Sequence, residues 1–121
     1  MKYELLYSEF TNLFPDDKQN LEQLTERASV DSSDGMHIIF GMVVIPFLME
    51  LVRKDEKEKL NRAFEFFEKM ANSENSLISE VLEFTILEDI VSGGKDILNI
   101  CKGYMGPKTL ECCDGIEKYM M

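Results

Sequence analysis

The side chain best suited to general acid–base chemistry is His37, which is the only histidine in the 121-residue chain. A catalytic histidine needs a nucleophile within reach and a third group that orients its ring. Cys101 could be that nucleophile, but no local sequence pattern joins it to His37. We therefore expect His37 to pack or to form a hydrogen bond at the start of a helix. An enzyme that uses His37 and a cysteine is kept as a third hypothesis.

The three cysteines, Cys101, Cys112 and Cys113, offer thiolate and metal chemistry only in a poor arrangement. Neighbours on a helix point about 100° apart, so Cys112 and Cys113 cannot bind one metal as a C-x-x-C pair does. An odd number of cysteines is also a poor disulfide framework. We expect reduced structural thiols in a cytoplasmic protein that has no visible secretory signal, no metal and no cofactor.

Asp31 and Asp34 lie in the short segment D-S-S-D-G, at residues 31–35. This segment lacks the further oxygen ligands and the closing glutamate of an EF-hand loop. Ser33 or Asp34 is better placed to cap the helix that begins near Met36. The phosphate-loop, dinucleotide, zinc-protease and nucleophile-elbow patterns are all absent from the sequence.

Acidic residues without neighbouring cations are the most informative charge feature. Between Met70 and Gly94 there is no Lys, Arg or His. The same stretch carries five carboxylates, half of the formal net charge of -10: Glu74, Glu80, Glu83, Glu88 and Asp89. Apolar residues at helical spacing run through it, so the carboxylates belong to a helix. An uncompensated acidic helix face suits a basic partner, and the alternative is an ordinary solvated face.

The composition excludes several kinds of partner. A sequence pI near 4.5 means that the phosphates of nucleic acid and anionic membrane surfaces would repel the protein. A hydrophobic content of 45% is that of a globular protein rather than a disordered chain. The expected partner is therefore a basic protein.

The apolar spacing predicts an all-α fold: a single domain over residues 1–121, an irregular bundle of about six helices with a central buried helix. Around that central helix we expect helices at about residues 2–13, 17–28, 55–71, 76–91, 95–104 and 107–119. The helices at 55–71 and 76–91, joined by a tight turn, could form an antiparallel pair of the HEAT-like kind.

The central helix corresponds to the apolar run from Met36 to Val52, 17 residues that only His37, Gly41, Pro46 and Glu50 interrupt. The run is marginal in length for crossing a bilayer and contains a proline and a glutamate, so a helix buried in the domain is the better interpretation. Pro46 should kink this helix or split it near Val44.

Several segments together resemble a family of small bacterial domains recorded mainly as a domain of unknown function. They are His37–Gly41 with Val44, Pro46–Leu48, Phe64–Glu68, Val81–Glu83 and Tyr104–Thr109. In size and acidity this family is similar to the immunity proteins of bacterial toxin–immunity pairs, including contact-dependent growth inhibition systems. The resemblance implies a protein that binds and neutralises a cognate toxin domain, often a basic nuclease. It implies no catalytic residue, and it leaves Gly41 and Pro46 with architectural roles in close helix packing and in the kink.

The first hypothesis is thus a cytoplasmic, non-enzymatic immunity protein. Its predicted partner-binding residues are Glu80, Glu83, Glu88 and Asp89, with Glu74 at the rim and with Asp31 and Asp34 as a second choice. Interfaces also need an aromatic anchor, for which Tyr104 and Tyr119 are candidates. The alternative is a helical adaptor or regulatory module that binds a protein other than a toxin.

Overall fold

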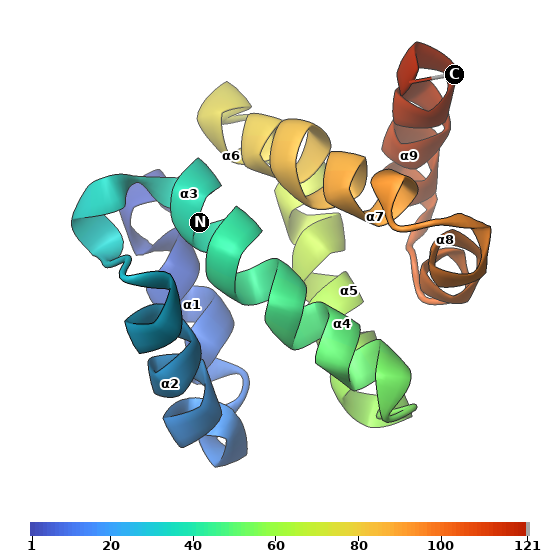
Figure 1. The fold of residues 1–121 in the computed structure, drawn as a ribbon. Coiled ribbons are helices and arrows are strands. Elements are labelled where there is room, and N and C mark those ends of the chain that lie inside the picture. The colour runs from blue at the N-terminus through green and yellow to red at the C-terminus, as the bar shows by residue number, and fades with distance from the viewer. Residues whose placement is uncertain (121) are drawn as a thin grey trace.

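A computed structural model describes residues 1–120, except the side chain of Ser32. The described residues form seven continuous helices and no strand, which confirms the all-α prediction (Figure 1). In chain order the elements are the 3₁₀ turn Tyr3–Leu5 with α1 (Leu6–Asn12), the 3₁₀ turn Pro15–Asp17 with α2 (Lys18–Ala28), the 3₁₀ turn Ser32–Asp34, α3 (Met36–Ile39), a π-helical segment (Phe40–Val44), α4 (Ile45–Arg53), α5 (Lys57–Ala71), α6 (Ser76–Val81), a second π-helical segment (Leu82–Leu87), α7 (Glu88–Ser92), α8 (Lys95–Lys102) and α9 (Pro107–Met120).

Two of these helices are long and carry a π-helical segment in the middle. The first long helix runs through α3 and α4 from Met36 to Arg53, and the second runs through α6 and α7 from Ser76 to Ser92. In both, buried residues recur at every fourth position. The buried rows are Met36, Phe40, Val44, Leu48 and Val52 in the first, and Ile78, Leu82, Ile86 and Ile90 in the second.

The π segments allow buried residues at every fourth position to stay on one side of the helix. An α-helix has 3.6 residues per turn, so a row at every fourth position would rotate about 40° around the axis at each step and leave the core. A π turn, with its i→i+5 hydrogen bonds, contains more residues per turn and rotates the row back. One π segment in each long helix therefore keeps the apolar row over the core along its whole length.

Pro46 follows the first π segment directly. A proline in a helix lacks an N–H and its ring collides with the carbonyl four residues earlier, here that of Met42. The widened turn at Phe40–Val44 provides room at that place, and the helix continues through Pro46 to Arg53. The predicted disturbance is present, but it is a π turn and not a break near Val44.

The first long helix is apolar and long enough to span a membrane by these two criteria alone, with 18 residues and a mean hydropathy of 1.8. Half of that window is buried inside the domain, and the core helix of a water-soluble protein meets the same criteria. Its buried side contributes to a single hydrophobic cluster, as predicted for the central helix.

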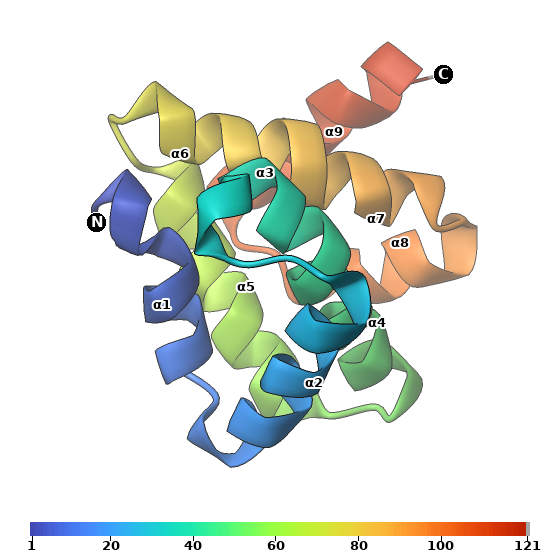
Figure 2. The same cartoon turned by 60° about the vertical axis from the view of Figure 1, so that its left-hand side comes forward.

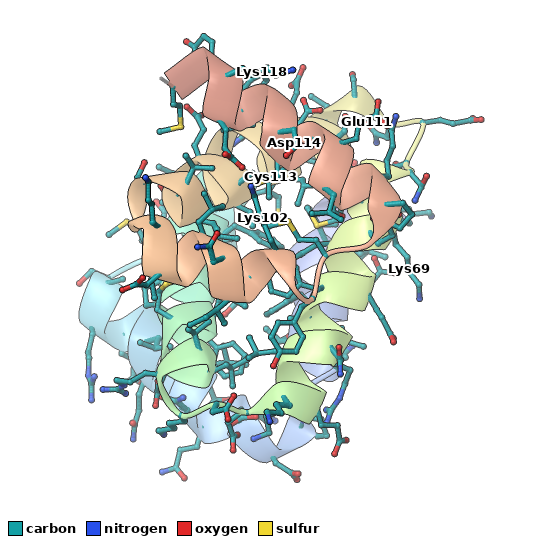
Figure 3. All side chains as sticks on the ribbon, turned by 90° about the vertical axis from the view of Figure 1, so that its right-hand side faces the viewer. Lys69, Lys102, Glu111, Cys113, Asp114 and Lys118 are labelled. Carbon is teal, nitrogen blue, oxygen red and sulfur yellow. The ribbon has the colours of Figure 1, made fainter. Side chains whose placement is uncertain are left out.

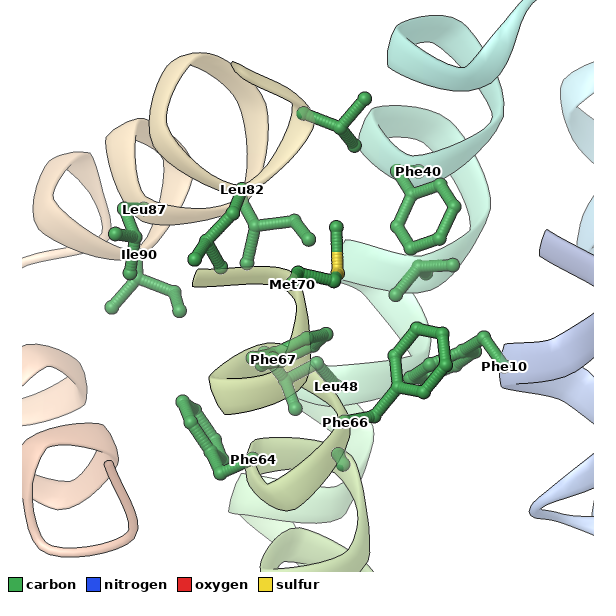
Figure 4. Close-up of a cluster of buried hydrophobic side chains, with 14 of the residues drawn as sticks. Phe10, Phe40, Leu48, Phe64, Phe66, Phe67, Met70, Leu82, Leu87 and Ile90 are labelled. Carbon is green, nitrogen blue, oxygen red and sulfur yellow. The ribbon is translucent and has the colours of Figure 1, made fainter. Parts of the chain in front are cut away.

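Phenylalanine rings form the middle of this cluster (Figure 4). The ring of Phe10, from α1, is fully buried. It packs with centroid separations of 5.1–6.4 Å against five other rings, Phe14, Phe40, Phe47, Phe66 and Phe67. Since aromatic pairs add stability beyond the area they bury, this cluster fixes α1, the first long helix and α5 to one another.

The second long helix follows α5 after a short turn. It begins where the Asn75 side chain accepts a hydrogen bond from the N–H of Leu77 at 3.0 Å, and it ends before Gly94, whose φ of 102° suits glycine. Figures 1 and 2 show it running across the end of α5. The two helices are neighbours, but their arrangement is crossed rather than the side-by-side antiparallel pair considered from the sequence.

A carboxylate from α5 holds the start of α9. Glu68 accepts hydrogen bonds from the backbone N–H of Thr109 at 2.8 Å, from its hydroxyl at 2.7 Å and from the N–H of Lys108 at 3.1 Å. Burial by itself would raise the pKa of Glu68, but these hydrogen bonds and one from Asn72 outweigh it and lower the pKa. Gly106 makes room for this cap, because a Cβ there would stand 2.6 Å from the Glu68 Cδ.

Candidate binding surface

The two long helices cross at their π segments (Figure 2). At the crossing, the Nδ1 of His37 lies 2.7 Å from the hydroxyl oxygen of Thr85, which confirms the expectation that His37 forms a hydrogen bond at a helix start. A Cβ on Gly41 would stand 3.4 Å from the Thr85 methyl group, an ordinary contact distance. The helices therefore do not require glycine at position 41 for close approach, contrary to the role predicted for it.

Asp89 lies on the same flank, with its Oδ2 3.9 Å from where a Gly41 Cβ would be. Partial burial against the first long helix, followed by the neighbouring charge of Glu88, raises the pKa of Asp89. This carboxylate is thus held where its own charge is unfavourable to the folded protein.

The outward side of the second long helix carries a short row in which an aromatic side chain lies between two carboxylates. Glu80, Phe84 and Glu88 are spaced four residues apart, and the π segment keeps them in line opposite the buried row. Phe84 is 54% exposed, although large aromatic side chains usually bury most of their surface. An aromatic ring between two carboxylates is therefore presented to solvent on this helix.

The outward side of the first long helix carries a matching apolar row. Ile38 is 46% exposed, Met42 is 47% exposed and Pro46 is also exposed. Ile38 and Met42 are the chain neighbours of His37 and Gly41, just as Phe84 and Glu88 are those of Thr85 and Asp89. We call the surface on both sides of this contact the crossing surface, and it consists of Ile38, Met42, Pro46, Glu80, Phe84, Glu88 and Asp89.

None of the carboxylates of the second long helix, among the residues that the structure describes, takes part in a salt bridge. The ion pairs lie elsewhere. One group joins Lys54, Lys57, Lys59 and Arg62 to Asp17 and to carboxylates between residues 50 and 58. The other group joins Lys102 and Lys108 to carboxylates of α9. The negative charge at the crossing surface is consequently not neutralised by the protein itself.

The five predicted carboxylates do not share one face. Glu80, Glu88 and Asp89 belong to the crossing surface, but Glu83 turns to the opposite flank, towards α9, where its charge contributes to the raised pKa of Cys112. Glu74 is exposed in the turn before α6. The five carboxylates therefore do not form the single acidic face expected. Glu83 stands one residue before Phe84 and Asp89 one residue after Glu88, so the two turn about 100° to opposite sides of the outward row.

Asp31 and Asp34 serve a local structural purpose. The side chain of Asp31 accepts from the N–H of Ser33 at 2.8 Å, and that of Asp34 accepts from the N–H of Asp31 at 2.8 Å. This capping box closes the 3₁₀ turn Ser32–Asp34, whereas no side chain caps the helix at Met36. The prediction that Ser33 or Asp34 caps the long helix is wrong, because Gly35 occupies the N-cap position. Within the described residues no group of three possible metal ligands occurs.

Cys101 lies on α8, and Cys112 and Cys113 lie on α9. Figure 3 views these two helices and labels Cys113. Cys101 and Cys113 are buried, and burial raises the pKa of Cys101 to about 12 and that of Cys113 to about 11. Lys102 bridges from α8 to Asp114 at 4.0 Å and to Glu117, both on α9. A buried thiol whose pKa is raised is seldom a thiolate and is therefore a weak nucleophile.

The aromatic anchors proposed from the sequence are not at the crossing surface. Tyr104 stacks on Phe64 with the ring centroids 6.2 Å apart, and Tyr119 is 77% exposed near the end of α9. Phe84 was not among the residues predicted for the binding surface. Its spacing of four residues from both Glu80 and Glu88 could have shown that it lies in line with these two carboxylates.

Comparison with protein families gives one match. Residues 7–121 match the model of a domain of unknown function, DUF7674. The chain belongs to the DUF7674 family. No curated protein and no solved structure matches the chain. The DUF7674 match covers all the segments on which the resemblance was based, while the relation to immunity proteins stays a prediction.

Proposed function

We propose that this DUF7674 domain is a non-enzymatic binding protein that docks a basic protein on the crossing surface. In the specific form of the proposal, the partner is a bacterial toxin domain with nuclease activity, and the domain acts as its immunity protein in the cytoplasm. The observation that carries the proposal is the group Glu80, Glu88 and Asp89, which lies without salt bridges on one side of a well-packed helix.

Electrostatics explains why such a group suits this function. A nuclease binds phosphates, so its active site carries positive charge. A fixed cluster of carboxylates attracts that site over a Debye length, speeds association and excludes the nucleic acid substrate. The raised pKa of Asp89 supports the proposal further, because a carboxylate that is unfavourable in the free protein gains most from a cationic partner.

The test is a capture experiment with matched charge variants. The wild type, a variant with Glu80→Lys, Glu88→Lys and Asp89→Lys, and a control with Glu22→Lys, Glu26→Lys and Asp96→Lys are used as bait in lysate of the native bacterium. Mass spectrometry identifies the retained proteins. The control changes the net charge equally but on exposed positions of α2 and α8.

We expect the wild type and the control to retain a basic toxin domain, and the crossing-surface variant to bind it at least about tenfold more weakly, with slower association at low salt. Co-expression with that toxin should protect cells only when the crossing surface is intact. Equal retention by all three baits would contradict the proposed surface. Retention of a housekeeping complex in place of a toxin would favour the adaptor alternative.

A further inference from the structure

The crossing surface also contains apolar residues, which electrostatic attraction of a basic partner does not require. Of the large hydrophobic side chains that are exposed among the described residues, Ile38, Met42 and Phe84 flank the contact of the two long helices. The others lie near the termini, at the start of α6 and on α8. Exposed apolar residues scattered singly are ordinary, but a group of them bordered by charge is typical of an interaction site.

The position of this group is set by the fold. His37 contacts Thr85 directly, and a Cβ on Gly41 would stand 3.4 Å from the Thr85 methyl group, so the two outward rows lie on either side of the place where the helices meet. Both rows are straight because each helix has a π segment there, and π segments are frequent at functional sites. Helical elements also hold side chains more rigidly than loops do, which lowers the entropy lost on binding.

We infer that Ile38, Met42 and Phe84 are the apolar anchors of the binding site, and that the partner's contact surface sets apolar side chains between lysines or arginines. This inference rests on the proposed function. The occupant follows from charge complementarity: Glu80, Glu88 and Asp89 border the apolar group, and the domain has no cation between Met70 and Gly94. A second copy of the chain would bring another acidic rim to the same place, so self-association through this surface is disfavoured.

The acidic and the apolar residues of the crossing surface should affect different rate constants of binding. Exposed charges govern the association rate and its salt dependence, whereas desolvated aromatic and aliphatic groups govern the dissociation rate. Phe84 offers a rigid ring, and Met42 offers a flexible, polarisable side chain that adapts to the shape of its partner.

The test uses two synthetic helical peptides as probes. The first carries a row of leucines flanked by lysines, and the second has the same lysines with serine in place of each leucine. Fluorescence anisotropy measures the affinity of each peptide for the full chain. Amide chemical shifts in NMR spectra locate the bound peptide.

We expect the wild type to bind the leucine peptide at least about tenfold more tightly than the serine peptide, with shifts at residues 37–42 and 80–89. The variants Phe84→Ser and Met42→Ser should lose this preference while keeping the affinity for the serine peptide. Ile100→Ser, which alters a side chain on α8 that is 45% exposed, should keep the preference. Because all three substitutions are at exposed positions, thermal unfolding should show each variant folded.

Equal binding of the two peptides by the wild type would overturn the anchor role and leave the acidic docking intact. So would a preference that survives both Phe84→Ser and Met42→Ser, or one that Ile100→Ser abolishes. Absence of binding for both lysine peptides would contradict the proposed function itself, because the crossing surface would then fail to attract cations.

Discussion

At the scale of single residues, Glu68 joins α5 to the start of α9 through three hydrogen bonds. Its carboxylate supplies the acceptor that two N–H groups at the start of α9 need, from a position 41 residues earlier in the chain than Thr109. The first N–H groups of a helix have no partner inside that helix, and an anion at this end also interacts favourably with the helix dipole. Glu68 is thus an N-cap contributed by another helix.

Replacing Glu68 by glutamine should destabilise the protein by about 1–2 kcal/mol at neutral pH, the usual contribution of a helix cap. The folded pKa of Glu68 lies below its ordinary value of 4.5, so this stabilisation is present above pH 4.5 and is lost as the pH falls through the folded pKa. Denaturant unfolding of both proteins across this pH range measures the difference. Glu65→Gln, an exposed change on the same helix, is the control and should have little effect at any pH.

Gly106→Ala offers an independent check on the same contact. The added methyl group would meet the end of the Glu68 side chain and push it away from α9. Gly106→Ala should lower the free energy of unfolding by about as much as Glu68→Gln does. The double variant should be at most about 0.5 kcal/mol less stable than the less stable of the two single variants. Additive effects of the two changes in unfolding experiments would show that Gly106 acts through something other than Glu68.

At the scale of elements, the four-residue period of the long helices is the organising feature. A π turn is equivalent to one residue inserted in an α-helix, so removing one residue there should restore an α-helix with the same buried side. Met42 is exposed within the first π segment, which makes it the natural residue to delete. Its removal shortens the helix by about 1.5 Å but leaves the apolar residues on both sides facing the core.

We predict that the Met42 deletion variant retains helical circular dichroism and cooperative thermal unfolding, at a lower midpoint than the wild type because the Pro46 ring then meets the carbonyl of Gly41. Deletion of Asn61, exposed in the middle of α5, is the control. Because α5 has no π segment, that deletion rotates every later residue by about 100° and exposes part of the phenylalanine cluster. Loss of cooperative unfolding in the Met42 deletion, to the same degree as in the Asn61 deletion, would contradict this account.

Local signals allowed most helix boundaries to be predicted from the sequence. Gly93 and Gly94, Pro107 and the Asn72–Asn75 turn mark ends that the structure confirms. The π segments were missed because the apolar spacing was compared with 3.6 residues per turn, although Met36, Phe40 and Val44 already show a period of four. The cap from Glu68 and the crossing of the long helices join residues distant in sequence, and no local pattern specifies such contacts.

At the scale of the whole molecule, charge is distributed unevenly. The ion pairs lie around α4, the start of α5 and the C-terminal helices, while the carboxylates of the second long helix repel one another without a compensating cation. Self-repulsion of this kind lowers the stability of a compact state. The arrangement is understandable if a partner supplies the missing positive charge.

We expect a variant with Glu80→Gln, Glu88→Gln and Asp89→Asn to unfold at a higher temperature than the wild type at low salt. Salt screens the repulsion, so the gain should shrink at about 0.5 M NaCl. It should shrink also as the pH falls through the raised pKa of Asp89, because the wild-type side chain then becomes neutral too. Scanning calorimetry measures both dependences.

The matched control neutralises three carboxylates that do have cationic partners, with Glu50→Gln, Glu58→Gln and Glu117→Gln. Hydrogen bonds from Lys54 and then from Asn20 lower the pKa of Glu50, so this residue stabilises the fold in its charged form. The control should therefore unfold at a lower temperature than the wild type. A gain in the control equal to that of the first variant would indicate that only net charge matters, and not its position.

The period of four has a consequence for how this domain can diverge. Because the π segments hold the inner and outer rows of each long helix straight and opposite, an outward residue has no part in core packing. Substitutions at Ile38, Met42 or Phe84 therefore leave the buried side chains of the neighbouring turns in place. A lineage that inherits this architecture can follow an evolving partner, or exchange it for another, through surface changes that leave the folding free energy almost unchanged.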